Sequence, residues 1–246
     1  MSNLNILVFH KIVNNKLGEW ADVKEALFIQ ILEAAKHNNQ TIVSINDWSQ
    51  NGDGDIALSF DDGCLSDYEV VLPLLKKNKV HGTFFIVVDF VGKTGYMSWE
   101  QIKQISDAGM EIGSHSLSHP ILTTLSGSKQ LLELKQSKVQ IEQKIGKKVN
   151  SFAYPYGDCS NKTHKAAKEA GYNNICTSRP GLSAPNVETF NRNSVHSNVT
   201  TDRIDDLLNP SRIDVLIQQL GYSIRNGLKR TLGIDNYIKI RKSIYS

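Results

Sequence analysis

The sequence places two adjacent carboxylates, Asp61 and Asp62, and two histidines four residues apart, His115 and His119, directly after short apolar segments. Adjacent carboxylates can divide the work of hydrolysis, one binding a metal while the other takes a proton from an attacking water. Two histidines at this spacing lie on one face if their segment is helical, and neutral imidazole is a common metal ligand. One carboxylate and two imidazoles leave a coordination position open, which is typical of a catalytic metal site.

Each cluster also has a plain structural interpretation. Asp-Asp-Gly is a frequent turn sequence, and a single histidine is more often a core or surface residue than a ligand. A third segment, residues 152–157 (FAYPYG), fits an ordinary strand-to-helix turn. The same segment could instead aim a backbone N–H at a developing oxyanion. The functional interpretation is favoured because the clusters occur together, each after a predicted strand.

Short apolar segments alternate with helical patterns along most of the chain. This alternation predicts an α/β fold with parallel strands and helices outside, in a small or incomplete barrel rather than two domains. Polar residues at the carboxyl ends of such strands meet at one rim. The predicted strands cover residues 6–9, 42–45, 56–60, 83–88, 110–113, 152–154 and 174–177, and the predicted helices cover residues 25–36, 68–77, 99–108, 129–145 and 162–170.

Three segments, in order, resemble the motifs of the polysaccharide deacetylases, the NodB-homology or carbohydrate esterase family 4 domain. They are SFDDG at 59–63, HSLSH at 115–119 and FAYPYG at 152–157. The surrounding HGTFFIV and AGMEIGSHSLSHPILTTL are also similar to family segments, and the resemblance covers about residues 4–200. It implies a distorted (β/α) barrel with about seven parallel strands. It also implies a metal-dependent hydrolase that removes an N-acetyl group from a sugar and releases acetate.

The resemblance also assigns roles to individual residues. It makes Asp61 the catalytic base and Asp62, His115 and His119 the ligands of one divalent metal ion. The backbone N–H of Tyr156 would help to hold the oxyanion while a metal-activated water attacks the acetamide carbon. Zinc is the expected ion, and cobalt, nickel and iron are alternatives because an Asp-His-His set suits all of them.

The sequence departs from the family pattern at two places. Ala153 stands where many members have an Arg that orients the base, a feature shared with the subset whose third motif is YP-aromatic-G. We expect Arg192 to replace that Arg, with Arg179 as the second candidate. No clear copy of the family's Leu-His motif is present. His10, at the end of the first strand, is therefore preferred as the further catalytic residue, and His196 is the alternative proton donor to the leaving amine.

The last part of the chain has a different pattern. We predict a deacetylase domain over residues 1–208 and a basic amphipathic helical extension over residues 209–246, which carries seven basic and two acidic residues. Ser211 with Asp214 forms a capping-box pattern. Large apolar residues then recur at three- and four-residue steps: Ile213, Leu216, Ile217, Leu220, Ile224 and Leu228. We expect the helix to pack on the barrel; the alternative is that residues 228–245 contact an anionic membrane surface.

Composition limits the class of protein. The chain has 246 residues, 40% hydrophobic and 22% charged, which is ordinary for a globular protein, and a net charge of +3, which is too mild to indicate nucleic acid as a partner. Its 3 cysteines are widely spaced and include no CxxC pair, against a disulfide framework or a thiolate zinc site. We find no signal-peptide pattern and no membrane-spanning segment, so we expect a cytoplasmic protein, with a peripheral membrane location as the alternative.

The substrate is less closely defined. Without a secretion signal, we expect an N-acetylated sugar that is nucleotide-linked, lipid-linked or an oligosaccharide rather than a cell-wall polymer. The same chemistry could cleave another amide or a formamide, because a fold does not choose the acyl group. A non-catalytic carbohydrate-binding protein is disfavoured, since the predicted base and all three predicted ligands are present. Nothing in the sequence specifies an oligomeric state.

Overall fold

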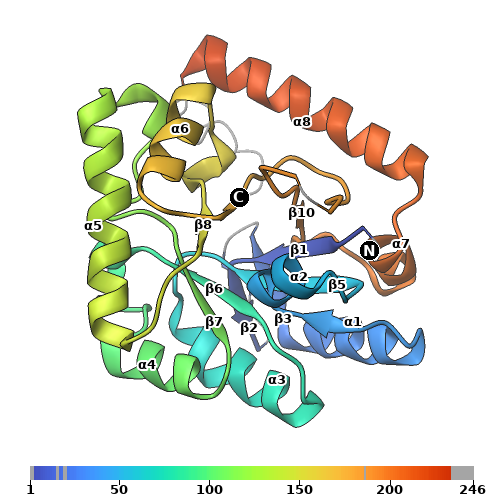
Figure 1. Ribbon diagram of the computed structural model, residues 1–246. Coiled ribbons are helices and arrows are strands. Elements are labelled where there is room, and N and C mark those ends of the chain that lie inside the picture. The colour runs from blue at the N-terminus through green and yellow to red at the C-terminus, as the bar shows by residue number, and fades with distance from the viewer. Residues whose placement is uncertain (1–2, 15–16, 19–20, 186, 234–246) are drawn as a thin grey trace.

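A curved parallel sheet lies at the centre of the computed structural model, which describes residues 3–14, 17–18, 21–185 and 187–233 (Figure 1). The strand order is β10-β1-β5-β6-β7-β8-β9, and β4 also pairs with β5. The central strands are β1 (Asn5–Phe9), β4 (Ile42–Val43), β5 (Ile56–Phe60), β6 (Thr83–Ile86), β7 (Glu111–Ser114), β8 (Ser151–Ala153), β9 (Asn174–Cys176) and β10 (Asn193–Ser194). A second, two-stranded sheet consists of β2 (Lys11–Val13) and β3 (Asp22–Lys24).

The two ends of the sheet approach each other through the segment before β10. Phe190 forms an isolated parallel bridge with Cys176 of β9, and β10 pairs with β1. The sheet therefore curls into a distorted (β/α) barrel with seven parallel strands along its main path, and the predicted fold class is confirmed. Helices surround the sheet: α1 (Glu25–His37), α2 (Ile45–Asn51), α3 (Leu72–Asn78), α4 (Trp99–Asp107), α5 (Gly127–Ile145), α6 (Asn161–Glu169), α7 (Ile204–Leu208) and α8 (Arg212–Leu232).

Strands β1, β5 and β6 are buried along their whole length, as expected for parallel strands covered on both faces. Aromatic rings join them to one another. The ring centroids of Phe60 and Phe84 lie 4.8 Å apart, and those of Phe9 and Phe60 lie 5.5 Å apart. This packing fixes the ends of the strands that carry the candidate catalytic residues.

Several element boundaries differ from the prediction for local reasons. The predicted strand over residues 42–45 ends at Val43, because Ser44 caps α2 by accepting a hydrogen bond from the Asp47 N–H. The predicted helix over residues 68–77 begins with a turn of π-helix, Asp67–Val71, before α3. The pair β2–β3 and the helices α2 and α7 were not predicted, since each is too short to show a periodic pattern.

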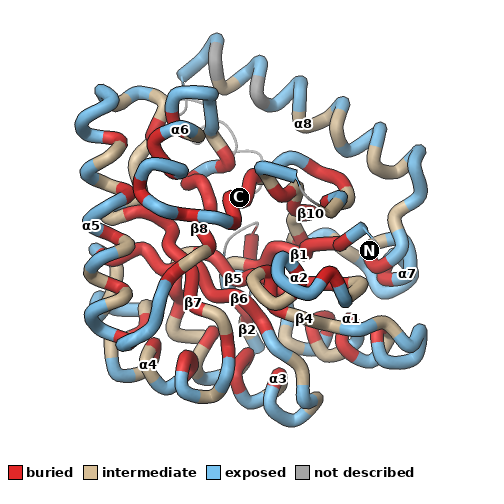
Figure 2. The backbone as a smooth tube through the Cα atoms, in the orientation of Figure 1, coloured by how far each residue is buried: buried red, intermediate tan, exposed pale blue. Residues whose placement is uncertain are grey.

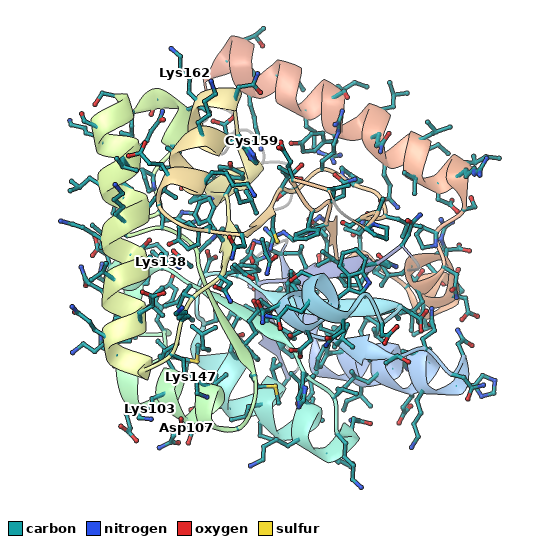
Figure 3. All side chains as sticks on the ribbon, viewed as in Figure 1. Lys103, Asp107, Lys138, Lys147, Cys159 and Lys162 are labelled. Carbon is teal, nitrogen blue, oxygen red and sulfur yellow. The ribbon has the colours of Figure 1, made fainter. Side chains whose placement is uncertain are left out.

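Cys64 and Cys176 are buried and Cys159 is exposed beside α6 (Figure 3), and no disulfide joins these three residues. The predicted capping box of Ser211 and Asp214 is confirmed at the start of α8. No helix among the described residues combines the length and apolar character needed to cross a bilayer.

The packing of α8 differs from the prediction. Six large apolar residues of this helix are 45–68% exposed, so the expectation that they pack on the barrel is wrong: Ile213, Leu216, Ile217, Leu220, Ile224 and Leu228. Residues 234–246 of the predicted extension, and with them most of the proposed membrane-contacting segment, lie outside the described residues. The boundary between residues 208 and 209 stays a prediction.

Candidate active site

The candidate residues gather where the strands of the main sheet end. Asp61 and Asp62 directly follow β5, and His115 directly follows β7. The backbone N–H of Asp61 donates to the Phe9 carbonyl oxygen of β1, which ties this strand end to its neighbour. Tyr156 follows β8 after two residues. Three strands thus deliver candidate residues to the same end of the barrel, where parallel α/β folds usually carry their sites.

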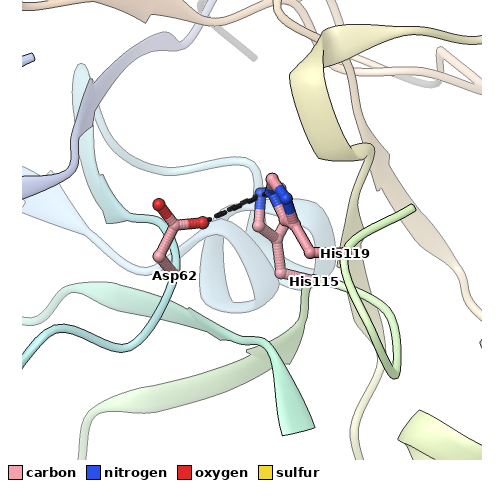
Figure 4. Close-up of side chains that lie close together, drawn as sticks. All are labelled: Asp62, His115 and His119. Carbon is pink, nitrogen blue, oxygen red and sulfur yellow. Dashed lines mark ion pairs between the residues drawn. The ribbon is translucent and has the colours of Figure 1, made fainter. Parts of the chain in front are cut away.

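Asp62, His115 and His119 form a compact three-residue cluster (Figure 4). The Asp62 Oδ1 atom lies 3.6 Å from Nε2 of His115 and 3.5 Å from Nε2 of His119. One ligand atom from each residue lies within 4.8 Å of the other two. The Nδ1 atom of His115 is 2.8 Å from the Ala153 carbonyl oxygen, which fixes the ring and leaves Nε2 to face the cluster. The donor types and their spacing fit a single divalent ion.

The two histidines meet through a turn rather than a helix, so the helical explanation of their spacing is wrong. Ser116 and His119 have left-handed backbone angles, with φ of 74° and 60°. The Ser116 hydroxyl accepts a hydrogen bond from the His119 N–H at 3.0 Å. Asp62 also has a positive φ, of 76°. Such angles are costly for residues other than glycine and tend to persist at functional sites, where the surrounding structure holds them.

A residue that the sequence did not point to holds this turn. The Glu133 carboxylate on α5 accepts hydrogen bonds from the backbone N–H groups of Leu117 and Ser118, at 3.1 and 2.9 Å. It also accepts one from the Ser118 hydroxyl at 2.7 Å. No sequence signal distinguishes Glu133 from the other charged residues of an amphipathic helix. These three hydrogen bonds tie the turn that carries the two histidines to α5.

Burial sets the protonation state of both imidazoles. It lowers the pKa of His115 to about 4, with the Arg192 charge acting in the same direction and that of Asp61 opposing it. It also lowers the pKa of His119 to about 4, helped by the neighbouring His115. Both rings are therefore neutral near pH 7, which is the state that binds a metal ion.

Asp61 is held by Arg192. The guanidinium donates two hydrogen bonds to the two carboxylate oxygens, at 2.8 and 2.9 Å, and its Nε donates to the Thr177 carbonyl oxygen at 2.9 Å. Arg192 is fully buried, and its Cζ lies 5.2 Å from the centre of the Phe85 ring. The side chain of Arg179, the second candidate, is exposed. Arg192 thus contacts Asp61, and its replacement of the Arg missing at Ala153 stays a prediction.

The ion pair keeps Asp61 ionised beside the metal cluster. Burial alone would raise the pKa of Asp61, but the charge and hydrogen bonds of Arg192, with His115 and His10, hold it well below its usual range. The Asp61 Oδ2 atom is 3.8 Å from Nε2 of His115. Asp61 is thus an ionised carboxylate next to the candidate ligands, as a general base must be.

His10 and His196 lie at the ends of neighbouring strands. Strands β1 and β10 pair in parallel with Val8 opposite Ser194, His10 directly follows β1, and His196 lies two residues after β10. His10 is close enough to the cluster for its charge to lower the pKa of Asp61 and of His115. The structure thus brings His10 to the site. The choice between the two histidines as proton donor stays a prediction.

Tyr156 occupies a tight turn at the mouth of the site. Its φ and ψ angles are 57° and 6°, and its ring centroid lies 4.6 Å from that of His119. The following Gly157 has a φ of 65°, and a Cβ atom there would lie 2.5 Å from the Cβ of Ser178. Only glycine fits at position 157, because any larger residue would collide with Ser178. Gly157 thus allows the tight turn that presents the backbone of Tyr156.

Asp67 is a buried carboxylic acid that the sequence analysis missed. It is 0% exposed, and neither of its carboxylate oxygens has a hydrogen-bond partner among the described residues. Burial, reinforced by the charges of Asp62 and Asp61, raises the pKa of Asp67 well above its usual range. The neighbouring Cys64 is also buried, and burial raises the pKa of its thiol, which argues against a nucleophilic role.

We expect Asp67→Asn to gain stability relative to the wild type between pH 4 and pH 8, because asparagine carries no proton that the unfolded chain can release. The unfolded chain releases the Asp67 proton above its ordinary pKa of 3.8, whereas the folded chain retains it. Stability is therefore lost as pH rises through the raised pKa, and the asparagine variant lacks this loss. Urea unfolding at pH 4 and pH 8 measures the difference. Exposed Asp53→Asn is the control, and an equal gain at both pH values would contradict the account.

Comparison with known proteins now adds to the geometry. The sequence model described as polysaccharide deacetylase matches residues 49–175, about half of the chain. The chain belongs to this family. The matched range contains the carboxylate pair, both histidines of the cluster and the FAYPYG segment, whereas His10 and Arg192 fall outside it.

Among curated relatives, the peptidoglycan-N-acetylmuramic acid deacetylase PdaA of Bacillus subtilis is 36% identical over 122 residues, 49% of this chain and 45% of that protein. The peptidoglycan-N-acetylglucosamine deacetylase of Bacillus cereus is 33% identical over 126 residues, 51% of this chain and 57% of that protein. The chain thus spans about half the length of the curated relatives it matches. The solved structure of the Streptococcus pyogenes deacetylase PplD in complex with acetate aligns with a TM-score of 0.77 at 23% identity, covering 85% of this chain and 99% of that one. This likeness supports the fold.

Proposed function

We propose that the protein is a metal-dependent hydrolase that removes the acetyl group from an N-acetylated sugar and releases acetate. The observation that carries the proposal is the position of Asp61. This ionised carboxylate is clamped by Arg192 and lies 3.8 Å from a nitrogen of the candidate metal cluster. Family membership and the names of the relatives point to the same activity.

The residues of the cluster fit one divalent ion. Asp62, His115 and His119 would hold it, and the hydrogen bond of His115 to the Ala153 carbonyl oxygen keeps its Nε2 turned toward the other two ligand atoms. The ion would act as a Lewis acid that polarises the acetyl carbonyl and makes water more acidic. We propose zinc, with cobalt, nickel or iron as alternatives, because this ligand set suits each of them.

The protein's own groups would carry out the proton transfers. Asp61 takes a proton from water as the water oxygen attacks the carbonyl carbon, and Arg192 holds Asp61 in place. The Tyr156 backbone N–H donates to the oxygen that becomes negative. When the C–N bond breaks, the amine nitrogen takes up a proton, for which His10 is our candidate donor. The products are acetate and a sugar with a free amino group.

We propose a nucleotide-linked, lipid-linked or oligosaccharide form of an N-acetylated sugar as the substrate class. The relatives named above are peptidoglycan deacetylases by name, so short peptidoglycan fragments belong in the same set of test substrates. A cytoplasmic location and peripheral membrane contact stay proposals.

We expect the zinc-loaded full chain to release one acetate for each free amine formed from at least one member of such a panel. A chelator should abolish the release, and re-added zinc should restore it. Without the ion, nothing at the three ligands polarises the acetyl carbonyl. An enzymatic acetate assay paired with fluorogenic labelling of amines measures both products. Absence of acetate from every substrate with the metal site filled would count against the proposal, and release of formate instead would favour formamide cleavage.

A further inference from the structure

Helix α8 presents its polar side to the barrel. The Gln219 side-chain amide donates to the Pro180 carbonyl oxygen at 3.0 Å. The Tyr222 hydroxyl donates to the Gly157 carbonyl oxygen at 3.4 Å, and the Lys229 ammonium donates to the Tyr156 carbonyl oxygen at 3.2 Å. Residues 219, 222 and 229 share one side of the helix at 3.6 residues per turn. The hydrogen bonds between α8 and the body thus come from one side of the helix between Gln219 and Lys229, and Val215 lies near Gly181 on the same side.

Helix α8 runs along the outside of the molecule (Figure 2), and the side opposite these contacts carries exposed apolar residues. The apolar stripe consists of Ile213, Leu216, Ile217, Leu220, Ile224 and Leu228, whose exposed fractions run from 45% to 68%. A surface helix of a globular protein normally turns such a stripe to the core. Contiguous exposed apolar surface of this kind marks an interaction site. The orientation of α8 thus leaves its whole apolar stripe to an external partner.

The charges beside the stripe indicate which partner. At about 100° per residue, Arg212 and Arg225 fall on opposite flanks of the apolar stripe. Residues 211–246 carry seven basic and two acidic residues. Arginines beside an outward apolar stripe suit the boundary between anionic head groups and acyl chains. A second copy of the helix would bring like charges together, which disfavours self-association through this side.

We propose that α8 is an interfacial helix that docks the protein on an anionic phospholipid bilayer through its apolar stripe. The polar side of the same helix contacts the carbonyl groups of Tyr156 and Gly157, at the mouth of the candidate site. Docking therefore places that mouth one helix diameter, roughly 10 Å, from the membrane surface. This location at the membrane, together with the proposed deacetylase function on which it rests, assigns a lipid-linked N-acetylated sugar as the substrate class.

Vesicle co-sedimentation of the full chain tests the docking. We expect the protein to sediment with phosphatidylcholine–phosphatidylglycerol vesicles at low salt and much less with phosphatidylcholine alone, because head-group attraction adds to apolar burial. The double variant Leu220→Gln/Ile224→Gln removes the centre of the stripe and should lower the partition coefficient at least about tenfold. The matched control is Leu132→Gln/Val139→Gln, two residues of α5 that are 52% and 48% exposed, and it should bind as wild type does.

Two results would overturn the proposal. One is wild-type protein that stays in the supernatant with anionic vesicles at low salt; light scattering without lipid then shows whether a second copy covers the stripe instead. The other is equal binding by wild type and the α8 variant, which would place the contact elsewhere. Acetate release from a soluble oligosaccharide is measured in parallel. If the protein releases acetate but does not bind vesicles, the docking proposal fails and the deacetylase function stands. If it binds vesicles but releases no acetate, only the deacetylase function is contradicted.

Discussion

Asp61→Asn is expected to lower kcat for acetate release by about 10²–10⁴-fold, the usual contribution of a general base. Asparagine has the same shape but cannot accept the proton that Asp61 would take from water. Because Asp61 is bound by Arg192 and lies beside the ligand set rather than within it, the variant should keep its metal at wild-type stoichiometry. Steady-state kinetics and elemental analysis of the purified variant measure the two quantities.

His115→Ala is the control for this result. It removes a ligand atom and should lose metal and activity together, whereas Asp61→Asn should separate them. Thermal unfolding of both variants checks that each is folded, since Asp61→Asn leaves the buried Arg192 without its carboxylate partner. Wild-type turnover in Asp61→Asn would remove Asp61 from the mechanism, and metal loss in Asp61→Asn would make it a ligand.

The sequence was sufficient to predict the fold because the determining pattern is local. Short apolar segments such as Ile56–Phe60 alternate with amphipathic helices, and parallel pairing follows from that alternation. Gly109 and Gly171 follow α4 and α6 with a φ of 87°, a backbone conformation that glycine adopts readily where a helix ends. The short pair β2–β3 and helix α2 carry no periodic signal and depend on tertiary contacts, which local patterns do not encode.

The candidate site was predictable only in part. The candidate metal ligands could be predicted because they are close in sequence to strand ends and match family motifs. The turn that brings His115 and His119 together could not, because it depends on Glu133, which is distant in sequence and ordinary in type. Burial of Asp67 and the outward apolar stripe of α8 were also missed. Both depend on which side of a helix meets the barrel, and periodicity identifies an apolar side without saying what covers it.

We expect Arg192→Met to lower kcat by about 10²-fold or more and to destabilise the protein by about 3–5 kcal/mol, the usual result of breaking a buried ion pair from one side. Arg192 is fully buried and supplies two hydrogen bonds to Asp61, so its loss leaves a buried carboxylate without compensation. Acetate-release kinetics and urea unfolding measure the two effects. The exposed Arg179→Met is the matched control and should change neither.

The pH dependence separates an electrostatic role of Arg192 from a purely structural one. In the wild type, the pKa of Asp61 is held below its ordinary 3.8, so the pair contributes stability above that pH and loses it as pH falls through the lowered pKa. In Arg192→Met, burial is no longer opposed, and the pKa of Asp61 should rise. Asp61 then loses its proton only at higher pH, so the acidic limb of the kcat/KM profile moves to higher pH. Stability also falls as pH rises through the new pKa of Asp61. Arg192→Lys keeps the positive charge but cannot donate two parallel hydrogen bonds to Asp61. It should bring the acidic limb of kcat/KM back toward its wild-type pH more fully than it restores kcat. An acidic limb that stays in place in Arg192→Met would show that Arg192 only packs beside Asp61.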